Sequence, residues 1–240
     1  MSDPTRTSQS TRHIGGPAGA AARTPAYAVA PRVRRPLAAA FRLLITAAAL
    51  TGLLMAARSG PSPARLAASF TGQATLALAV VSAGSARRAW TGRHPLSPRL
   101  TGAVLCYVAL AALAQHALPV TAFTLPSPGP GATAAQALPH LLLFTLVPLA
   151  AVADWLLLTA PRGFRLAHAR QWPAYPLLYL CFALTLPAAA GAPAPSLPTA
   201  LTLALAAFLL PLIAIGTDQL RPAPRRRGNR ISPTGISPLK

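Results

Sequence analysis

The feature that most constrains this chain is a series of six apolar stretches, each close to the length that a helix needs to cross a membrane. Such a helix takes about 20 mostly apolar residues, and roughly 17 can suffice. The second stretch is diluted by hydroxyl and amide side chains, and the fifth is short and rich in proline. We therefore predict an all-α, polytopic membrane protein with six transmembrane helices. The stretches run approximately Pro36 to Ala57, Ala67 to Gly84, Leu100 to Leu118, Ala137 to Thr159, Pro173 to Ala188, and Pro198 to Gly216.

The composition agrees with a membrane protein. Hydrophobic residues make up 53% of the chain and charged residues 10%, and the mean hydropathy of +0.46 is too high for an ordinary soluble domain. Cys106 and Cys181 both fall inside apolar stretches, so we predict two small buried residues and neither a disulfide nor a thiolate metal site. Sequence motifs for nucleotide, zinc or redox chemistry are missing, and we predict no cofactor and no metal.

The net charge of +19 could indicate a nucleic-acid partner or an anionic lipid surface. Basic residues near the ends of spans are retained on the cytoplasmic side of a membrane. All 22 basic residues except Arg58 and Arg65 fall on one side of the six-span arrangement, while the connections 119–136 and 189–197 carry no charge. Topology therefore explains the charge, both termini are predicted to be cytoplasmic, and no nucleic-acid partner is expected.

The two ends of the chain differ in composition from the middle. Residues 1–35 are rich in arginine, serine and proline, which fits either a disordered cytoplasmic tail or an organellar transit peptide. Residues 36–220 form the predicted six-helix transmembrane domain, and residues 221–240 form a basic cytoplasmic tail. Membrane lipids are the expected partners, with anionic head groups at the basic tails.

A few charged side chains lie at membrane depth, where an unpaired charge costs roughly 2.5 to 3.5 kcal/mol. Arg42 and Asp154 are predicted to lie at similar depth near the cytoplasmic end, so we expect a structural ion pair between them. Asp218, close to Arg221 at the end of the last stretch, is expected to be interfacial.

Three polar residues fall in the outer half of the predicted membrane domain: Thr71, His116 and His140. A hydroxyl beside a neutral imidazole is the minimum needed for nucleophilic attack on an ester, because histidine can accept the hydroxyl proton. The alternative is structural, since threonine commonly forms hydrogen bonds between helices and a histidine near a span end can face interfacial water. The spacing leaves both interpretations open.

Five segments of the chain carry a family resemblance: PLAAAFRLLITAAALTGLL from Pro36, SFTGQATLALAVVSAGSARRAW from Ser69, RLTGAVLCYVALAALAQHALP from Arg99, VPLAAVADWLLLTAPRGFRL from Val147, and WPAYPLLYLCFAL from Trp172. They resemble the actinobacterial six-span membrane proteins of the Pr6Pr family. The runs Ser-Ala-Arg-Arg-Ala-Trp and Asp-Trp-Leu-Leu-Leu-Thr are the most specific parts, and the sixth stretch matches more loosely. The resemblance implies a multi-pass protein of a bacterial plasma membrane.

That family is distantly similar to the androgen-induced membrane proteins, which are threonine hydrolases of fatty-acid esters of hydroxy fatty acids. The similarity implies that Thr71, in a Phe-Thr-x-Gln motif, is the nucleophile and that His116 matches a histidine at the end of the third span. The second catalytic histidine is replaced by Phe144, and His140, one turn earlier, is the residue that could substitute for it. Thr75 stands where relatives carry a polar residue, typically asparagine.

Three functions follow as hypotheses. The first is a non-catalytic membrane protein that binds lipid or a partner, which the replacement by Phe144 favours. The second is an intramembrane threonine hydrolase that uses Thr71 with His140 or His116. The third is a small-molecule transporter, for which paired polar residues near the membrane midplane are scarce.

Overall fold

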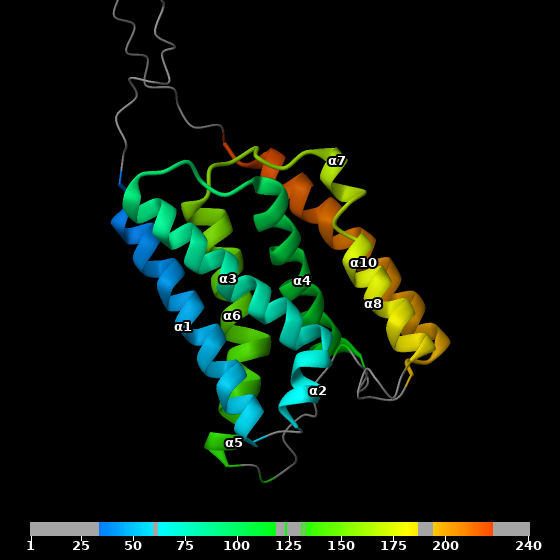
Figure 1. Cartoon of the computed structure of the whole chain (residues 1–240). Coiled ribbons are helices and arrows are strands. Elements are labelled where there is room, and N and C mark those ends of the chain that lie inside the picture. Colours follow the sequence, from blue (N-terminus) through cyan, green and yellow to red (C-terminus); the bar gives the residue numbers. More distant parts are fainter. Residues whose placement is uncertain are drawn as a thin grey trace, which may run out of the picture. The chain divides into compact units, whose positions relative to one another are not determined.

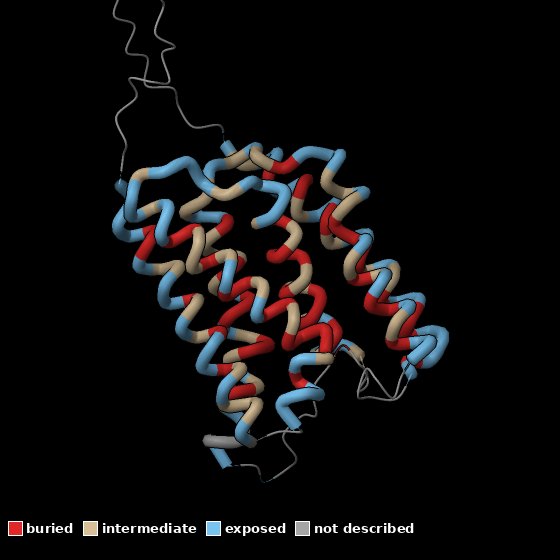
Figure 2. The backbone as a smooth tube through the Cα atoms, in the orientation of Figure 1, coloured by how far each residue is buried: buried red, intermediate tan, exposed pale blue. Residues whose placement is uncertain are grey.

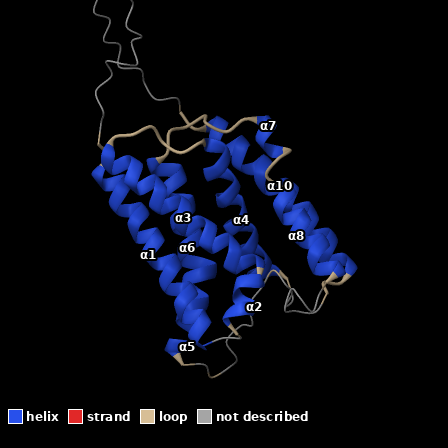
Figure 3. Cartoon of the chain, in the orientation of Figure 1, coloured by secondary structure: helices blue, strands red, loops and turns tan. Residues whose placement is uncertain are grey.

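The computed structural model describes residues 34–59, 62–118, 123, 131, 133–186 and 194–222. This described part of the chain is helical and contains no strand (Figure 3). The prediction of an all-α protein is therefore confirmed for these residues. Most of both predicted tails, residues 1–33 and 223–240, lies outside the described residues, as does much of the two uncharged connections.

The helices follow the predicted stretches with shifted ends (Figure 1). A continuous helical segment from residue 134 to 158 combines α-helical and π-helical turns. The elements are α1 (Pro36–Ser59), α2 (Pro63–Ala68), α3 (Phe70–Thr91), α4 (Pro98–Ala117), α5 (Ala134–Leu141), η2 (Leu142–Leu146), α6 (Val147–Ala153), η3 (Asp154–Leu158), α7 (Leu166–Ala169), α8 (Ala174–Thr185) and α10 (Leu197–Leu220).

The helices of residues 34–222 pack as neighbours in space. Helices α1 and α3 lie side by side and antiparallel, and α3 also packs against α4 (Figure 1). The segment from α5 to η3 packs against α1 and α4, while α10 contacts α4, α7 and α8. This arrangement brings the chain near residue 35 next to the end of α3, where the Arg35 N–H donates to the Ala89 carbonyl at 3.0 Å.

Four of the helical segments are long and apolar enough to cross a membrane: Pro36–Arg58, Pro98–Ala117, Ala137–Leu158 and Leu197–Leu220. Large side chains on their surfaces remain exposed, among them Leu44 at 67%, Leu157 at 79% and Leu201 at 62%. Figure 2 shows exposed positions all along these helices. A helix surface of this kind is stable in hydrocarbon but not in water. The other two predicted spans coincide with α3, which has 22 residues, and α8, which has 12.

The two cysteines behave differently. Both are free, and Cys106 on α4 is buried as predicted. The prediction that Cys181 is buried is wrong, because its position on α8 is exposed.

The π-helical turn η2 has a local cause. Pro148 has no N–H and its ring cannot approach the carbonyl group four residues earlier, which belongs to Phe144. A widened turn directly before this proline relieves the clash, as π-helical insertions do elsewhere in proteins. The carbonyl oxygen of Phe144 consequently lacks its ordinary helical donor.

Candidate functional site

Thr71 is held in place by a sharp corner between α2 and α3. Ser69 ends α2 and begins α3, with its hydroxyl oxygen accepting from the Gly72 N–H at 3.0 Å. The same hydroxyl donates to the Leu66 carbonyl at 2.7 Å. A Cβ atom at Gly72 would lie 2.0 Å from that carbonyl oxygen, so only glycine fits the corner. The first turn of α3, which contains Thr71, is therefore rigidly oriented.

The Thr71 side chain is completely buried. Its hydroxyl donates a hydrogen bond of 2.8 Å to the carbonyl oxygen of Phe123, which lies between α4 and α5 in the chain. Neither His116 nor His140 is among the hydrogen-bond partners described for this hydroxyl. The hydroxyl proton thus bonds to a backbone acceptor that cannot act as a base.

An aromatic cluster surrounds this bond. The Phe70 ring lies 4.6 Å from Phe123, 5.6 Å from Tyr175 and 5.4 Å from Tyr179, measured between ring centroids. The Tyr179 hydroxyl donates to the Ala68 carbonyl at 2.9 Å, and the Tyr175 hydroxyl donates to Oε1 of Gln73. The Phe-Thr-x-Gln motif is therefore used for packing, since its phenylalanine and glutamine both contact α8.

The two histidines lie next to each other, at the end of α4 and on α5. Their ring centroids are 6.5 Å apart, with the ring planes perpendicular. Nε2 of His116 lies 3.3 Å from the Phe144 carbonyl oxygen. In the tautomer that is protonated on Nε2, this nitrogen donates to the carbonyl in place of the N–H that Pro148 lacks. Nε2 of His140 is buried and has no hydrogen-bond partner among the described residues.

Phe144 occupies the place of the expected histidine. It is 2% exposed and its ring lies 4.8 Å from the His140 ring. Thr75, four residues after Thr71, is also buried. The structure therefore brings His116, His140 and Phe144 together, while the contact described for the Thr71 hydroxyl goes to Phe123.

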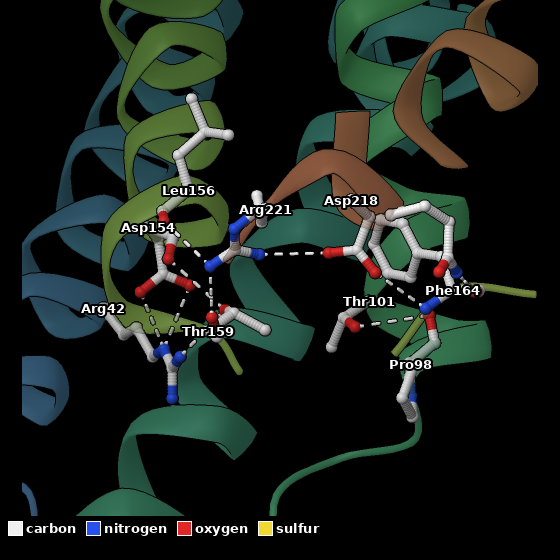
Figure 4. Close-up of polar contacts among 10 residues, drawn as sticks. Arg42, Pro98, Thr101, Asp154, Leu156, Thr159, Phe164, Asp218 and Arg221 are labelled. Carbon is white, nitrogen blue, oxygen red and sulfur yellow. Dashed lines mark hydrogen bonds and ion pairs between the residues drawn. The ribbon is translucent and has the colours of Figure 1, made fainter. Parts of the chain in front are cut away.

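A second polar cluster lies near the ends of α1, η3 and α10 (Figure 4). Arg42 Nε lies 2.9 Å from Oδ1 of Asp154 and 3.1 Å from Oδ2, which is the ion pair that we predicted from depth. Thr159 extends the cluster, because its hydroxyl oxygen accepts from a terminal nitrogen of Arg42 at 3.4 Å. The Arg42 charge is thereby neutralised inside the helix bundle.

Asp218 and Arg221 form the other half of this cluster. Asp218, expected at the membrane interface, is 1% exposed, so protein groups and not interfacial water surround its carboxylate: its Oδ2 accepts from the Phe164 N–H at 2.9 Å and its Oδ1 from Arg221 at 3.0 Å. Arg221 also donates to the carbonyl oxygens of Leu156 and Thr159, as Figure 4 shows. Together these contacts connect α10 to η3 and to the loop that follows it.

Several residues of both clusters were not singled out in the sequence. For Tyr175 and Tyr179, the only indication in the sequence was their spacing of four residues, which places both on one face of a helix. Asp218 was named together with Arg221, but its contact with the Phe164 N–H was not expected. Within the described residues, no three histidine, cysteine or acidic side chains are grouped so that they could hold a metal ion.

Comparisons with models of known protein families, with characterised proteins and with solved structures found no match to this chain. The contacts of the two clusters and the distribution of charge are therefore the basis on which a function can be inferred.

Proposed function

We propose that this chain is a non-catalytic, lipid-binding protein of a bacterial plasma membrane, with six spans and both termini in the cytoplasm. The main support for a non-catalytic function is the buried hydroxyl of Thr71, which donates to the Phe123 carbonyl at 2.8 Å. A nucleophilic hydroxyl needs a base to accept its proton, and a backbone carbonyl cannot serve. The contacts of His116 support the same proposal, because this ring compensates for Pro148.

Helix α3 supports the six-span topology although its composition is mixed. Its 22 residues would extend about 33 Å, which exceeds the hydrocarbon thickness of a typical bilayer. The polar side chains Thr71, Thr75, Ser82 and Ser85 are buried within the protein. Leu76 and Val80, by contrast, are exposed at 52% and 65%. A span whose polar side chains face neighbouring helices presents an apolar surface to lipid.

Helix α8 is the shorter of the two additional spans. Its 12 residues extend only about 18 Å, so crossing the membrane requires the flanking residues or a locally thinned bilayer. Leu178 is 69% exposed on its surface while Tyr179 and Ala183 are buried on the other side. This division between a lipid-facing and a protein-facing side is the pattern that a transmembrane helix requires.

Accessibility of single cysteines tests the topology. A variant that lacks Cys106 and Cys181 would receive one cysteine at position 94 in the loop after α3, or at position 131 between α4 and α5. In intact bacteria, we expect an impermeant maleimide to modify position 131 and not position 94. Equal labelling at the two positions would contradict the proposed orientation.

Hydrolysis assays test the absence of catalysis. Purified protein in nanodiscs would be incubated with fatty-acid esters of hydroxy fatty acids, beside Thr71→Ala and the matched control Thr202→Ala, whose threonine is exposed on α10. We expect no hydrolysis above protein-free nanodiscs in any sample. Turnover that Thr71→Ala abolishes and Thr202→Ala retains would establish the threonine hydrolase instead, in keeping with the resemblance to the Pr6Pr family.

A further inference from the structure

Seven arginines in and beside two loops have no acidic partner within the described part of the chain. The two described carboxylates, Asp154 and Asp218, are paired with Arg42 and Arg221. The third acidic residue, Asp3, lies outside the described residues. The charge of these loops must therefore be balanced from outside the described residues. The arginines are Arg87, Arg88, Arg93, Arg99, Arg162, Arg165 and Arg170.

The backbone of two of these arginines, Arg99 and Arg165, is held by a rigid unit built around Trp172. This side chain is 2% exposed, and its Nε1–H donates to the Arg99 carbonyl at 2.9 Å. A Cβ atom at Gly102 would lie 2.3 Å from the Trp172 ring, so α4 approaches the indole as closely as a helix can. Phe164 covers another side, with its ring centroid 5.0 Å away at nearly a right angle. The first turn of α4 is thereby fixed against the loop before α8.

His168 connects this unit to the second arginine. Its ring stacks on Trp172 at 5.4 Å between centroids, with 24° between the planes. Its Nδ1 accepts from the Arg165 N–H at 3.2 Å, which leaves the proton of the neutral ring on Nε2. The partly exposed ring therefore offers a donor beside the two exposed arginines.

The electrostatics agree with this proximity. Partial burial and then the charges of Arg99 and Arg165 lower the pKa of His168 below its ordinary value. Both guanidinium groups therefore act on the same imidazole. An anion bound among the three groups would relieve the repulsion between the two guanidinium groups, because both acidic side chains of the described residues are paired elsewhere.

We infer that Arg99, Arg165 and the Nε2–H of His168 form a binding site for the phosphate of an anionic lipid head group. Guanidinium groups form paired, charge-assisted hydrogen bonds with phosphate oxygens. Loops on the cytoplasmic side face a leaflet that carries such lipids. The assignment of the phosphate to a lipid rests on the proposed topology. The ability of the three groups to bind a phosphate does not depend on that topology.

Arg87 and Arg88 provide the matched control. They lie at the end of α3, are exposed, and carry the same charge as the pair formed by Arg99 and Arg165. Arg88 donates to the His94 carbonyl at 3.3 Å, and no contact described for Arg87 or Arg88 involves the Trp172 unit. A general attraction to negative charge would use both pairs equally, whereas a built site would use only one.

Native mass spectrometry of the full chain in detergent tests the site, with phosphatidic acid as the probe and phosphatidylcholine as the neutral reference. We expect Arg99→Gln/Arg165→Gln to weaken phosphatidic acid binding about tenfold or more, and Arg87→Gln/Arg88→Gln to change it less than about twofold. Equal losses in the two double variants, or no preference of the wild type for phosphatidic acid, would overturn the inference. Thermal unfolding of each variant verifies folding, and Arg99→Lys/Arg165→Lys, which keeps the charge, should restore only part of the affinity.

A competition arm identifies the source of the phosphate. Inorganic phosphate at millimolar concentration should leave phosphatidic acid binding unchanged if the site recognises a lipid. Displacement of the lipid by inorganic phosphate would contradict a lipid ligand and favour a soluble phosphate compound. Because binding in detergent does not depend on orientation, failure of the proposed topology would appear in the cysteine labelling and not in this measurement.

Discussion

The hydroxyl of Thr71 donates a hydrogen bond of 2.8 Å to the carbonyl oxygen of Phe123, which lies 52 residues later in the sequence. This bond ties the first turn of α3 to the connection between α4 and α5. A buried carbonyl without its donor costs about 1 to 3 kcal/mol. The bond therefore gives Thr71 a structural role that is independent of any chemistry.

Replacement of Thr71 by valine, which has the same shape, tests this role. We expect Thr71→Val to destabilise the protein by about 1 to 3 kcal/mol, because the Phe123 carbonyl would lose its donor in a buried position. The same change at the exposed Thr202, whose hydroxyl donates to the Pro198 carbonyl on the same helix, should have a much smaller effect. Thermal unfolding in detergent measures both, and equal effects would contradict the structural role of Thr71.

His116 and Pro148 should be energetically coupled through the Phe144 carbonyl. We expect His116→Ala to cost about 1 kcal/mol in the wild-type protein, since the carbonyl then loses its partner. In a Pro148→Ala background the restored N–H can bond to that carbonyl, so the same change should cost less. A double-mutant cycle from unfolding measurements gives the coupling, and purely additive effects would show that His116 does not compensate for Pro148.

Gly102 should tolerate no side chain. Gly102→Ala places a Cβ atom 2.3 Å from the Trp172 ring, and we expect a loss of about 1 to 3 kcal/mol from overpacking. Gly84→Ala is the control, because its Cβ would meet Leu96 at an ordinary 3.7 Å. Circular dichroism melts of the two variants compare the positions. A Gly102→Ala protein as stable as Gly84→Ala would mean that Trp172 does not pack against α4 as closely as described.

Removing one partner of the buried pair formed by Asp218 and Arg221 should destabilise the protein more, per side chain changed, than removing both. We expect Asp218→Asn to destabilise the protein by about 3 to 5 kcal/mol, because Arg221 is left partly buried without its counter-charge. Asp218→Asn/Arg221→Gln should cost less than the sum of the two single changes. Additive losses in chemical unfolding would show that the two charges do not interact.

His168 should titrate at lower pH than a free histidine. Burial and the charges of Arg99 and Arg165 disfavour the imidazolium, so the pKa of this ring lies below its ordinary value in the folded protein. Between the ordinary pKa of histidine and the lower pKa in the folded protein, the unfolded chain binds more protons than the folded protein does. The free energy of unfolding should therefore decrease as the pH falls through this interval. Nuclear magnetic resonance of the labelled ring measures the pKa, and Arg165→Gln should raise it.

The sequence was sufficient to predict the helical class and the approximate position of each long helix, because length and apolarity are local properties. It also predicted the ion pair between Arg42 and Asp154, since the two residues stand at similar depth in the first and fourth stretches. Helix ends were harder to place. Ser69 begins α3 inside the second predicted span, and the left-handed Gly92 ends this helix eight residues after the predicted boundary.

The contacts of the candidate site could not be predicted from depth alone. Thr71, His116 and His140 were expected at similar depth in the outer half of the membrane domain, but depth does not determine in which direction a side chain points from its helix. The donor of the Phe123 carbonyl and the π-helical turn before Pro148 depend on packing between distant segments. The burial of Asp218 likewise depends on the Phe164 N–H, which belongs to a loop 54 residues earlier.

The most direct test of the account is labelling of the purified, folded protein in nanodiscs with a fluorophosphonate probe, followed by mass spectrometry of the peptide that contains Thr71. Because the Thr71 hydroxyl is buried and bonded to a carbonyl, we expect no modification of this residue in the wild type. Modification of Thr71 that disappears in Thr71→Val, and that also requires His116 or His140, would contradict the account and establish an activated nucleophile.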